Sequence, residues 1–410
     1  MPIKQIEIKA FKSIVNQTVD LGQLNVFIGT NGAGKSNFLE ALGVLSCAVA
    51  GQVSYSKLAE RGIRLSAPEV FKSSFRNLDR KNAFSLKAQF DDLTYSTTIN
   101  PNNEANFDFS AEAIDRNGFR IGGRSNRGVT LESTSMPKEL MKPFFSKGQS
   151  VISALEILGA FTETESLQLQ ALKDYAIYAI STPILRGVSS DDSHKEPLGL
   201  YGGSLSVALK DVIDEIHPTK TKKHDLQRFF KLLDWFEEIG TTNAISSQLQ
   251  SNHLHTGKNV VSYRDKYMRT NFNSLYAYDV SEGALYILFI LVLLMHKKSP
   301  DIFALDNVDN SLNPGLVREL MGNISSILKE HPEKQMFMTT HNPTTLDAID
   351  LFNDQQRLFV VARNAQGHTE IKRISPPANF TREQWVEKHQ GLRLSEIWLS
   401  GLIGGLPQGF

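Results

Sequence analysis

The stretch Gly29-Thr30-Asn31-Gly32-Ala33-Gly34-Lys35-Ser36 decides the fold, because it fits the pattern G-x4-G-K-[ST] of a phosphate-binding loop. Glycines in such a loop let successive backbone N–H groups turn toward phosphate oxygens. Lys35 should reach the β- and γ-phosphates of a nucleotide, and the Ser36 hydroxyl should bind Mg²⁺. The alternative is a glycine-rich turn that matches the pattern by chance, and the flanking sequence separates the two.

The residues on either side supply the strand and the helix that such a loop requires. Leu24 to Ile28 is a short apolar run, which is typical of a buried strand. After the loop, apolar residues recur at helical spacing, at Phe38, Leu42, Leu45 and Val49. A helix that starts near Ser36 and Asn37 would direct its positive end at the same phosphates. We therefore predict that residues 29–37 bind the nucleotide.

An acidic residue is needed to complete the metal site of such a loop, and Asp306 is the candidate. It follows the apolar run Ile302 to Leu305, which reads as a buried strand. An aspartate at the end of such a strand can bind Mg²⁺ directly or through water. An ordinary aspartate that caps a turn is the alternative interpretation. Ser36 and Asp306 are thus the predicted metal ligands.

Two further segments fit the same site. Ser281-Glu282-Gly283 begins an apolar helix 25 residues before Asp306, and a hydroxyl and a glycine at a helix start favour anion binding. A plain helix cap is the alternative for this segment. His341 follows another apolar run, residues 336–338, and a histidine there could sense the γ-phosphate. A structural loop histidine is the alternative for His341.

The chain divides into three parts by pattern, and the fold class is α/β. In residues 1–110, apolar and polar residues alternate as in strands, except in the one helix that follows the phosphate loop. The segment from Phe84 to Ile99 is typical of a hairpin. Residues 111–268 look like a compact, mostly helical insertion, with an apolar helical face from Leu226 to Phe236. Residues 269–410 alternate strand and helix and close with a hairpin at residues 358–374.

Composition excludes some classes of protein and leaves others open. The chain has 410 residues with 44 Lys+Arg and 44 Asp+Glu, so the net charge suggests neither a nucleic-acid nor a membrane partner. DNA remains possible only through a local patch such as Lys220, Lys222 and Lys223, which a solvated loop explains equally. The longest apolar run, Ala284 to Met295, is too short to span a membrane. With the single Cys47, these features predict a soluble, cytoplasmic protein.

Taken in order, these elements resemble the ABC-type P-loop ATPases of the SMC, RecF and OLD-like group. The opening residues 6–13 and 24–29 are similar to the entry strands of that group, and Ser281-Glu282-Gly283 is similar to its signature motif. Residues 306–314 and 340–343 resemble its Walker B, D-loop and switch-histidine segments. The resemblance implies an ATPase head, with a mixed sheet and an antiparallel β subdomain, in which two protomers enclose two ATP molecules head to tail. Ser281 and Gly283 would then bind the γ-phosphate of the partner's nucleotide.

Asn307 departs from the pattern of this group, which usually has glutamate directly after the Walker B aspartate. Asparagine accepts no proton and cannot act as a general base, although it can orient water. Hydrolysis would be slow, or Asp309 of the D-loop region would act as the base, or a partner would supply the missing group. Asp306, Asn307, Asp309 and His341 are therefore the predicted catalytic set.

The resemblance leaves more than one biological role open. A stand-alone ATPase of this group is often paired with a separate effector, such as a nuclease, in bacterial antiphage defence. The alternatives are a DNA-repair or recombination ATPase of the RecF or SMC type, and a nearly inactive nucleotide-binding scaffold. We expect ATP and Mg²⁺ as ligands and a homodimer or higher oligomer in each case.

Overall fold

The computed structural model describes residues 2–102, 107–131, 146–216, 231–245, 249, 259–307 and 312–405. By its internal contacts the chain forms two compact units. Unit 1 comprises residues 1–177, 300–308 and 331–410, and unit 2 comprises residues 178–299 and 309–330. The phosphate loop and Asp306 therefore belong to unit 1, whereas Ser281 belongs to unit 2.

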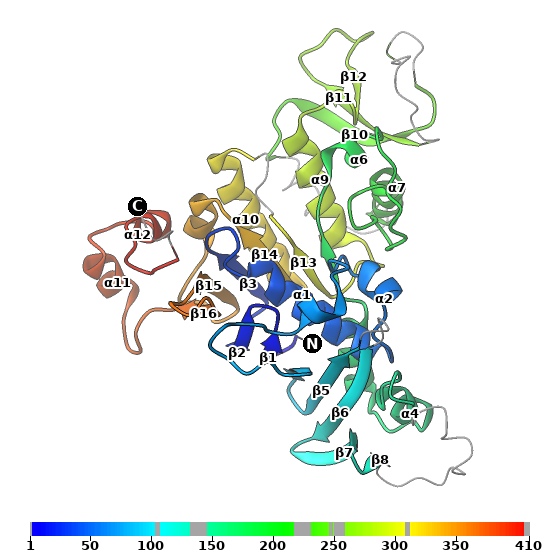
Figure 1. The fold of residues 1–410 in the computed structure, drawn as a ribbon. Helices are drawn as coiled ribbons and strands as arrows, with labels where there is room; N and C mark the ends of the chain where they lie inside the picture. The colour runs from blue at the N-terminus through cyan, green and yellow to red at the C-terminus, as the bar shows by residue number, and fades with distance from the viewer. Residues whose placement is uncertain are drawn as a thin grey trace. The chain divides into compact units, whose positions relative to one another are not determined.

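A six-stranded sheet with a parallel centre carries the phosphate loop (Figure 1). Its strands, in spatial order, are β16 (Thr369–Ile374), β15 (Gln356–Arg363), β3 (Leu24–Ile28), β14 (Gln335–Thr340), β13 (Ile302–Leu305) and β9 (Ala176–Tyr178). Strands β15, β3, β14 and β13 run parallel, and β16 pairs antiparallel with β15. Every residue of β3, β13 and β14 is buried, which is why these strands read as continuous apolar runs. The predicted strands and the closing hairpin are confirmed.

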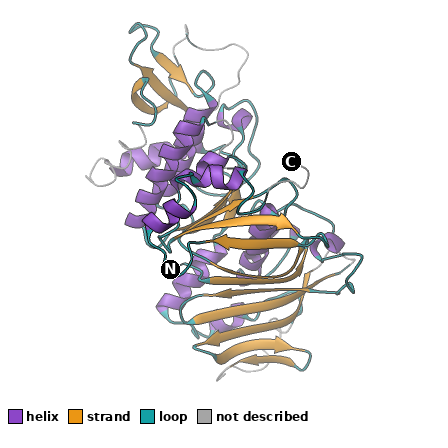
Figure 2. Ribbon diagram, turned by 90° about the vertical axis from the view of Figure 1, so that its left-hand side faces the viewer, coloured by secondary structure: helices purple, strands orange, loops and turns teal. Residues whose placement is uncertain are grey.

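The second sheet of unit 1 is antiparallel and seven-stranded (Figure 2). Its strands, in spatial order, are β2 (Ile14–Asp20), β1 (Gln5–Phe11), β4 (Phe84–Gln89), β5 (Leu93–Pro101), β6 (Phe107–Arg116), β7 (Phe119–Ser125) and β8 (Gly128–Leu131). Buried and more exposed residues alternate along β4 and β5, as expected of a sheet with one face on the core. The hairpin predicted from Phe84 to Ile99 is confirmed, and the sheet extends beyond it.

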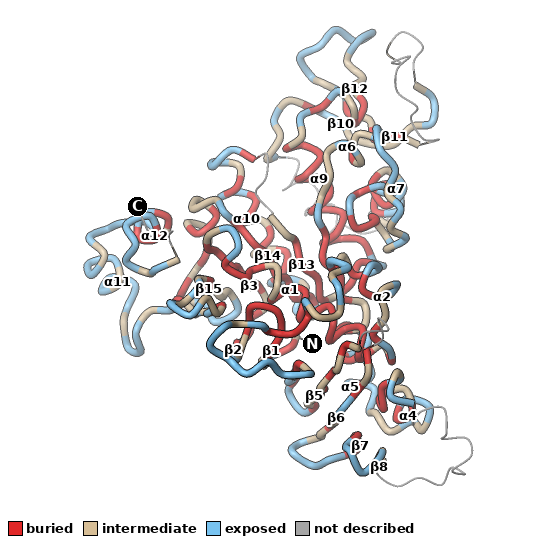
Figure 3. Tube along the Cα trace, viewed as in Figure 1, coloured by how far each residue is buried: buried red, intermediate tan, exposed pale blue. Residues whose placement is uncertain are grey.

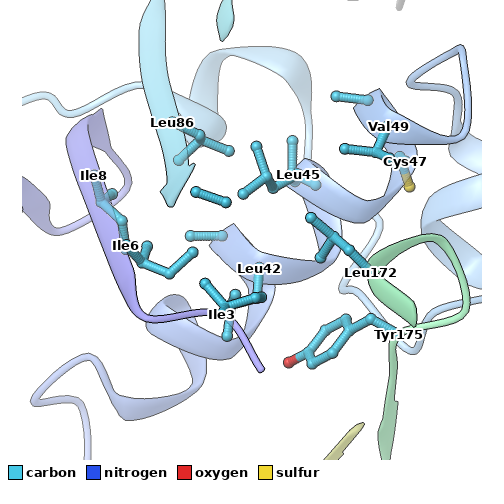
Figure 4. Packing of buried hydrophobic residues seen from close by; sticks show 14 of the residues in the cluster. Ile3, Ile6, Ile8, Leu42, Leu45, Cys47, Val49, Leu86, Leu172 and Tyr175 are labelled. Carbon is cyan, nitrogen blue, oxygen red and sulfur yellow. The ribbon is translucent and has the colours of Figure 1, made fainter. Parts of the chain in front are cut away.

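Helix α1 (Lys35–Val49) fills the core of unit 1 and is buried over almost its whole length. Leu42 and Leu45 of α1 lie toward Ile6 of β1 and Leu86 of β4 (Figure 4). The other helices that the structure describes in this unit are α2 (Tyr55–Ala59), η1 (Pro68–Phe71), α4 (Ile152–Ile157), α5 (Glu163–Lys173), η3 (Pro343–Ala348), α11 (Arg382–Lys388) and α12 (Leu394–Leu399). The helix predicted after the phosphate loop is thus confirmed, and its apolar residues hold the loop against the core.

Gln335 ties the N-terminal segment to the six-stranded sheet. Its side chain is fully buried, accepts a hydrogen bond from Ile3 N at 2.9 Å, and donates to Ile3 O at 2.8 Å and to Gly22 O at 2.7 Å. A buried amide is tolerated only when its polar atoms find partners, and here they do. These hydrogen bonds of Gln335 hold the residues before β1 beside β14, the strand that leads to His341.

Unit 2 is built around one helix that is buried on all sides. Helix α9 (Glu282–Met295) is buried from Gly283 onward, and helix α7 (Leu205–Ile216) packs against it. The other elements of the unit are α6 (Thr182–Leu185), β10 (Phe236–Thr242), β11 (Val260–Asp265), β12 (Ser274–Tyr276) and α10 (Pro314–Glu330). A helix that is apolar all round is a core helix, so the run at residues 284–295 is explained by burial. Figure 3 shows this burial along α9.

Strands occupy parts of the segment that we predicted to be mostly helical. Residues 107–131 contain β6, β7 and β8, and the described residues between 231 and 276 form the three-stranded sheet β10-β11-β12. The helical face predicted from Leu226 to Phe236 is wrong at its end, because Phe236 begins β10. Leu233 of that face also lies outside any helix, whereas residues 217–230, which hold the other residues of the face and the lysine cluster, lie outside the described residues. In this segment, a short run of apolar residues fits a helix and a short strand equally well, so the sequence pattern did not distinguish them.

Among the helices that the structure describes, none combines the length and the apolar character needed to cross a membrane.

Candidate functional site

The phosphate loop joins the end of β3 to the start of α1, and two of its glycines are required by close packing. A Cβ atom on Gly29 would lie 2.0 Å from the backbone oxygen of Val361. A Cβ atom on Gly34, which has φ of 114°, would lie 2.2 Å from Thr369 Oγ1. Only glycine avoids the clash at both positions, and at Gly34 it also avoids the strain of a positive φ. The loop therefore has its backbone, and not side chains, pressed against strands β15 and β16.

Lys35 is the first residue of α1, and its side chain is buried within the loop. Its Nζ atom donates to the carbonyl oxygen of Gly29 at 2.8 Å and to that of Thr30 at 3.0 Å. The ammonium group is thus held at the N-terminal end of the loop. A cation at this point would meet the terminal phosphates of a nucleotide laid along the loop.

Ser36 and Asp306 are 270 residues apart in the sequence and adjacent in the structure. Ser36 Oγ lies 3.2 Å from Asp306 Oδ2 and 3.4 Å from Oδ1. Asp306 follows β13, and Thr339 at the end of neighbouring β14 donates its hydroxyl to Asp306 Oδ1 at 2.5 Å. The carboxyl ends of parallel strands are where ligands bind in open α/β sheets. A hydroxyl and a carboxylate oxygen form the donor set that Mg²⁺ prefers when phosphates complete its shell, so these residues fit the metal.

Asn307 adopts a backbone conformation that few residue types tolerate. Its φ is 57°, in the left-handed region, where asparagine is several-fold enriched over most other non-glycine residues. Its backbone N–H donates to Thr339 Oγ1 at 2.9 Å. Thr339 therefore fixes both Asp306 and Asn307, although sequence reasoning did not select it. Its signal was its position two residues before His341, at the buried end of a strand.

The hairpin of β15 and β16 supports the loop from the other side, and the sequence alone did not indicate this. Thr369 Oγ1 lies 2.7 Å from both Ser13 Oγ and the carbonyl oxygen of Ala33. Arg363 Nε donates to the carbonyl oxygen of Gly32 at 2.9 Å. Burial lowers the pKa of the Arg363 guanidinium below its usual value. These contacts fix the glycine-rich backbone in place before any ligand binds.

A polar chain also extends from α1 toward residue 64. Asn37 Nδ2 donates to Ser13 Oγ at 2.6 Å, and Arg64 Nη2 donates to Asn37 Oδ1 at 2.8 Å. Arg64 also donates to the buried carboxylate of Glu40 at 2.5 Å, and this hydrogen bond raises the pKa of Arg64. Lys12 pairs with the same carboxylate, and burial lowers the pKa of Lys12. The network orders the first turn of α1 and supplies positive charge beside Asn37.

The signature segment of unit 2 forms the start of α9. Ser281 is the helix N-cap, and its Oγ accepts from Ala284 N at 3.4 Å. The Thr182 hydroxyl, at the start of α6, donates to the carboxylate of Glu282. Arg186 Nη2 donates to the carbonyl oxygen of Val280 at 3.2 Å. The segment is thus held by Thr182 of α6 and by Arg186, which directly follows α6, while Ser281 itself is exposed.

His341 is exposed at the end of β14, between two residues with structural roles. The Thr340 hydroxyl accepts from Asn342 N at 3.0 Å, and Asn342 Oδ1 accepts from Thr344 N at 3.0 Å and so caps η3. The histidine therefore projects from a turn that its neighbours hold. Asp309, the predicted residue of the D-loop region, lies outside the described residues.

The chain matches the family described as "AAA domain, putative AbiEii toxin, Type IV TA system" over residues 24–347. No curated protein matches it. Among solved structures, it is similar to an SMC head bound to the C-terminal winged-helix domain of ScpA, with a TM-score of 0.52 and 13% identity over 92% of this chain and 98% of that one.

Two other solved structures have comparable coverage. The SMC head with an extended coiled coil, bound to the C-terminal domain of ScpA from Pyrococcus furiosus, gives a TM-score of 0.50 and 12% identity over 95% of this chain and 98% of that one. The recombination mediator RecF in its ATPγS-containing structure gives a TM-score of 0.36 and 12% identity over 90% and 98%. At 12–13% identity, the two SMC heads show the fold of this chain alone.

Proposed function

The chain belongs to this AAA-domain family and is an ABC-type P-loop ATPase of the SMC and RecF group, and from this premise we propose that two copies enclose ATP and Mg²⁺ head to tail. The observation that carries the proposal is the contact of Ser36, Asp306 and Thr339 beside the phosphate loop. In one protomer this cluster would hold the metal and the phosphates. The signature segment of a second protomer would close the site.

The residues of the first protomer would bind and orient the triphosphate. Lys35 would move its ammonium group from the carbonyl oxygens of Gly29 and Thr30 to the terminal phosphates. Ser36 and Asp306 would hold Mg²⁺, and Thr339 would keep the Asp306 carboxylate turned toward Ser36. When bound, Mg²⁺ neutralises the negative charge that develops on the phosphoryl group.

Hydrolysis by this arrangement would be slow, because Asn307 cannot remove a proton from the attacking water. The amide can hold a water molecule by a hydrogen bond, and exposed His341 could contact the γ-phosphate. Asp309 or a partner protein would have to supply a base for faster turnover. ATP would then act mainly to hold two protomers together until a partner triggers release.

We favour a role in bacterial antiphage defence, in which this ATPase controls a separate effector such as a nuclease. Slow turnover suits a switch whose state must persist, and the substitution of Asn307 for the usual glutamate supports it. The similar SMC heads are bound to a ScpA domain, which supports the use of this fold as a docking platform for another protein. A DNA-repair ATPase of the RecF or SMC type is the second candidate, favoured by the fold, and strong DNA stimulation of turnover would select it.

A mixing experiment tests the head-to-tail arrangement. Lys35→Ala removes the phosphate ligand of one protomer, and Ser281→Asp keeps the helix cap but adds a negative charge that would repel the γ-phosphate. Neither variant alone should form an ATP·Mg²⁺-dependent dimer. An equal mixture should regain dimers with one intact site, measured by analytical ultracentrifugation together with phosphate release.

Ser281→Asn is the matched control, because asparagine caps a helix as well as aspartate without adding charge. This variant should dimerise more readily than Ser281→Asp. Failure of the mixture to recover, with both variants folded and Ser281→Asp still binding ATP, would show that each protomer acts alone. A wild-type protein that binds ATP and stays monomeric would contradict the proposal directly.

A further inference from the structure

The loop between β11 and β12 in unit 2 carries aromatic and basic residues. Figure 1 shows the place of this loop, and Figure 3 shows that it is exposed. Tyr267 is 75% exposed, Phe272 is 48% exposed and Met268 is 42% exposed. Lys266 and Arg269 are exposed between them. Large apolar side chains are seldom left in water together, so a cluster of this kind marks an interaction site. The phosphate loop and the signature segment use none of these residues.

The loop is held in shape by hydrogen bonds between its own residues. Asp265 Oδ1 accepts from Tyr267 N at 2.7 Å and from Met268 N at 3.1 Å. Asp265 N donates to Asn273 O at 2.8 Å, and Phe272 N donates to Arg269 O at 2.8 Å. One oxygen of the loop's single carboxylate is therefore occupied by N–H groups. The exposed rings are thus presented by an ordered turn, which lowers the entropy cost of binding.

An aromatic cluster anchors the base of this loop. The ring of Tyr263 on β11 lies 5.5 Å from that of Trp235 and 5.4 Å from that of Phe236, measured between centroids. Lys266 N donates to the carbonyl oxygen of Trp235 at 3.1 Å. These contacts bury one set of rings, including that of Tyr263, and leave Tyr267 and Phe272 outside it. Packing of the hairpin therefore does not explain the two exposed rings.

The charge of the loop is positive although that of the whole chain is zero. Arg264 pairs with Glu238, but neither Lys266 nor Arg269 forms an ion pair with any residue that the structure describes. The Lys266 ammonium lies 4.9 Å from the centroid of the Tyr267 ring. The two cations are thus available to phosphate groups, and one of them stands beside an exposed aromatic face.

We propose that this loop, residues 264–273, binds single-stranded nucleic acid. Unpaired bases stack on aromatic rings, and lysine and arginine beside the rings bind the phosphates. In a duplex the base faces are already stacked, so exposed tyrosine and phenylalanine rings find no equivalent partner there. An acidic protein surface would satisfy the cations but would not require two exposed rings. The inference does not depend on ATP binding, because the loop is separate in sequence from every predicted nucleotide ligand.

Fluorescence anisotropy with a labelled oligothymidine, in the absence of ATP, tests the proposal. Tyr267→Ala should weaken binding about 10-fold, and Tyr267→Trp should restore it, because stacking on one aromatic ring carries about that effect. Lys266→Gln and Arg269→Gln should each lower the salt dependence by about 0.7 in the slope of log K against log salt. Since all three residues are exposed, circular dichroism should show unchanged folding.

Phe119→Ala is the matched control, because Phe119 is 77% exposed and lies next to Arg120 in unit 1. Binding of the oligothymidine should be unaffected by this change. Absence of binding at low salt, or equal losses in Tyr267→Ala and Phe119→Ala, would overturn the proposal. If a duplex bound as tightly as the oligothymidine, the loop would be a duplex-binding site and the proposal would be overturned. If polyglutamate bound as tightly, and Tyr267→Ala had no effect, the loop would bind an acidic protein and the proposal would also be overturned.

Discussion

The phosphate loop of unit 1 and the signature segment of unit 2 are two anion-binding candidates that are supported in different ways. The loop has its backbone pressed against β15 and β16, Lys35 is held inside it by the carbonyl oxygen of Gly29, and Ser36 already lies beside Asp306. The signature segment is the exposed start of a buried helix, held by Thr182 of α6 and by Arg186, which directly follows α6. One region is tightly constrained, whereas the other depends on a few side-chain contacts.

This difference indicates which half of a shared site would bind ATP and which half would join the two protomers. A preformed loop can bind a nucleotide without a large ordering cost, so each protomer would bind ATP alone. The signature segment would add its contacts only when a second protomer arrives. Substitutions in the phosphate loop should therefore abolish ATP binding. Substitutions around the signature segment should weaken dimer formation and leave ATP binding by the monomer unchanged.

The largest effect is expected from Gly29→Ala. The added Cβ atom would lie 2.0 Å from a backbone oxygen of β15, which cannot move as a side chain can. We expect a loss of about 3 kcal/mol in the free energy of unfolding and at least about 100-fold weaker ATP binding. Chemical denaturation and titration with a fluorescent ATP analogue measure the two.

Gly32→Ala is the control for this change, because no atom lies within 4 Å of its added Cβ although φ is 75°. It should cost only about 1 kcal/mol, the strain of a left-handed alanine. If Gly29→Ala were no worse than Gly32→Ala, the loop would be more mobile than its contacts indicate. The contrast with the signature segment would then be lost.

The second largest effect is expected from Asn307→Glu. A carboxylate could accept the proton of the attacking water, so turnover should rise at least about 10-fold. Asn307→Gln is the matched control, because it has the same length and, like glutamate, must adopt a φ near 57°, but it offers no base. Steady-state phosphate release measures both. Equal rates in the two variants would show that the base is elsewhere, in Asp309 or in a partner.

Local sequence was sufficient to predict the phosphate loop, its flanking strand and helix, and the strand that leads to Asp306. Each has a pattern within about ten residues, and their order along the chain carried the resemblance. Thr339, Thr369, Ser13 and Arg363 were not selected, because their contacts join segments up to 356 residues apart and leave no periodic pattern. The strands of residues 107–131 and 236–242 were missed because short apolar spacings fit helix and strand alike.

A smaller effect is expected from Arg186→Ala in the signature region. The change removes the donor to Val280 O, directly before Ser281, so the start of α9 would be less well fixed. ATP-dependent dimerisation should weaken about 5-fold, which corresponds to one hydrogen bond, and ATP binding by the monomer should not change. ATP-dependent dimerisation of Arg186→Lys should be intermediate between that of the wild type and that of Arg186→Ala. An equal loss of monomer binding would show that the two regions are not separable.

The smallest effect is expected from an exposed ion pair that contacts neither the phosphate loop nor the signature segment. Arg382 donates to both carboxylate oxygens of Asp350, at 2.8 and 2.7 Å, and the hydrogen bonds hold the pKa of that carboxyl below its usual range. Because the folded pKa is the lower one, the stabilisation is present above the unfolded pKa and is lost as pH falls through the folded value. Asp350→Asn should lower Tm by about 1 °C at neutral pH, and the difference should shrink only below about pH 4. A difference that instead disappeared near pH 6 would point to a histidine, and the ion pair would not be the cause.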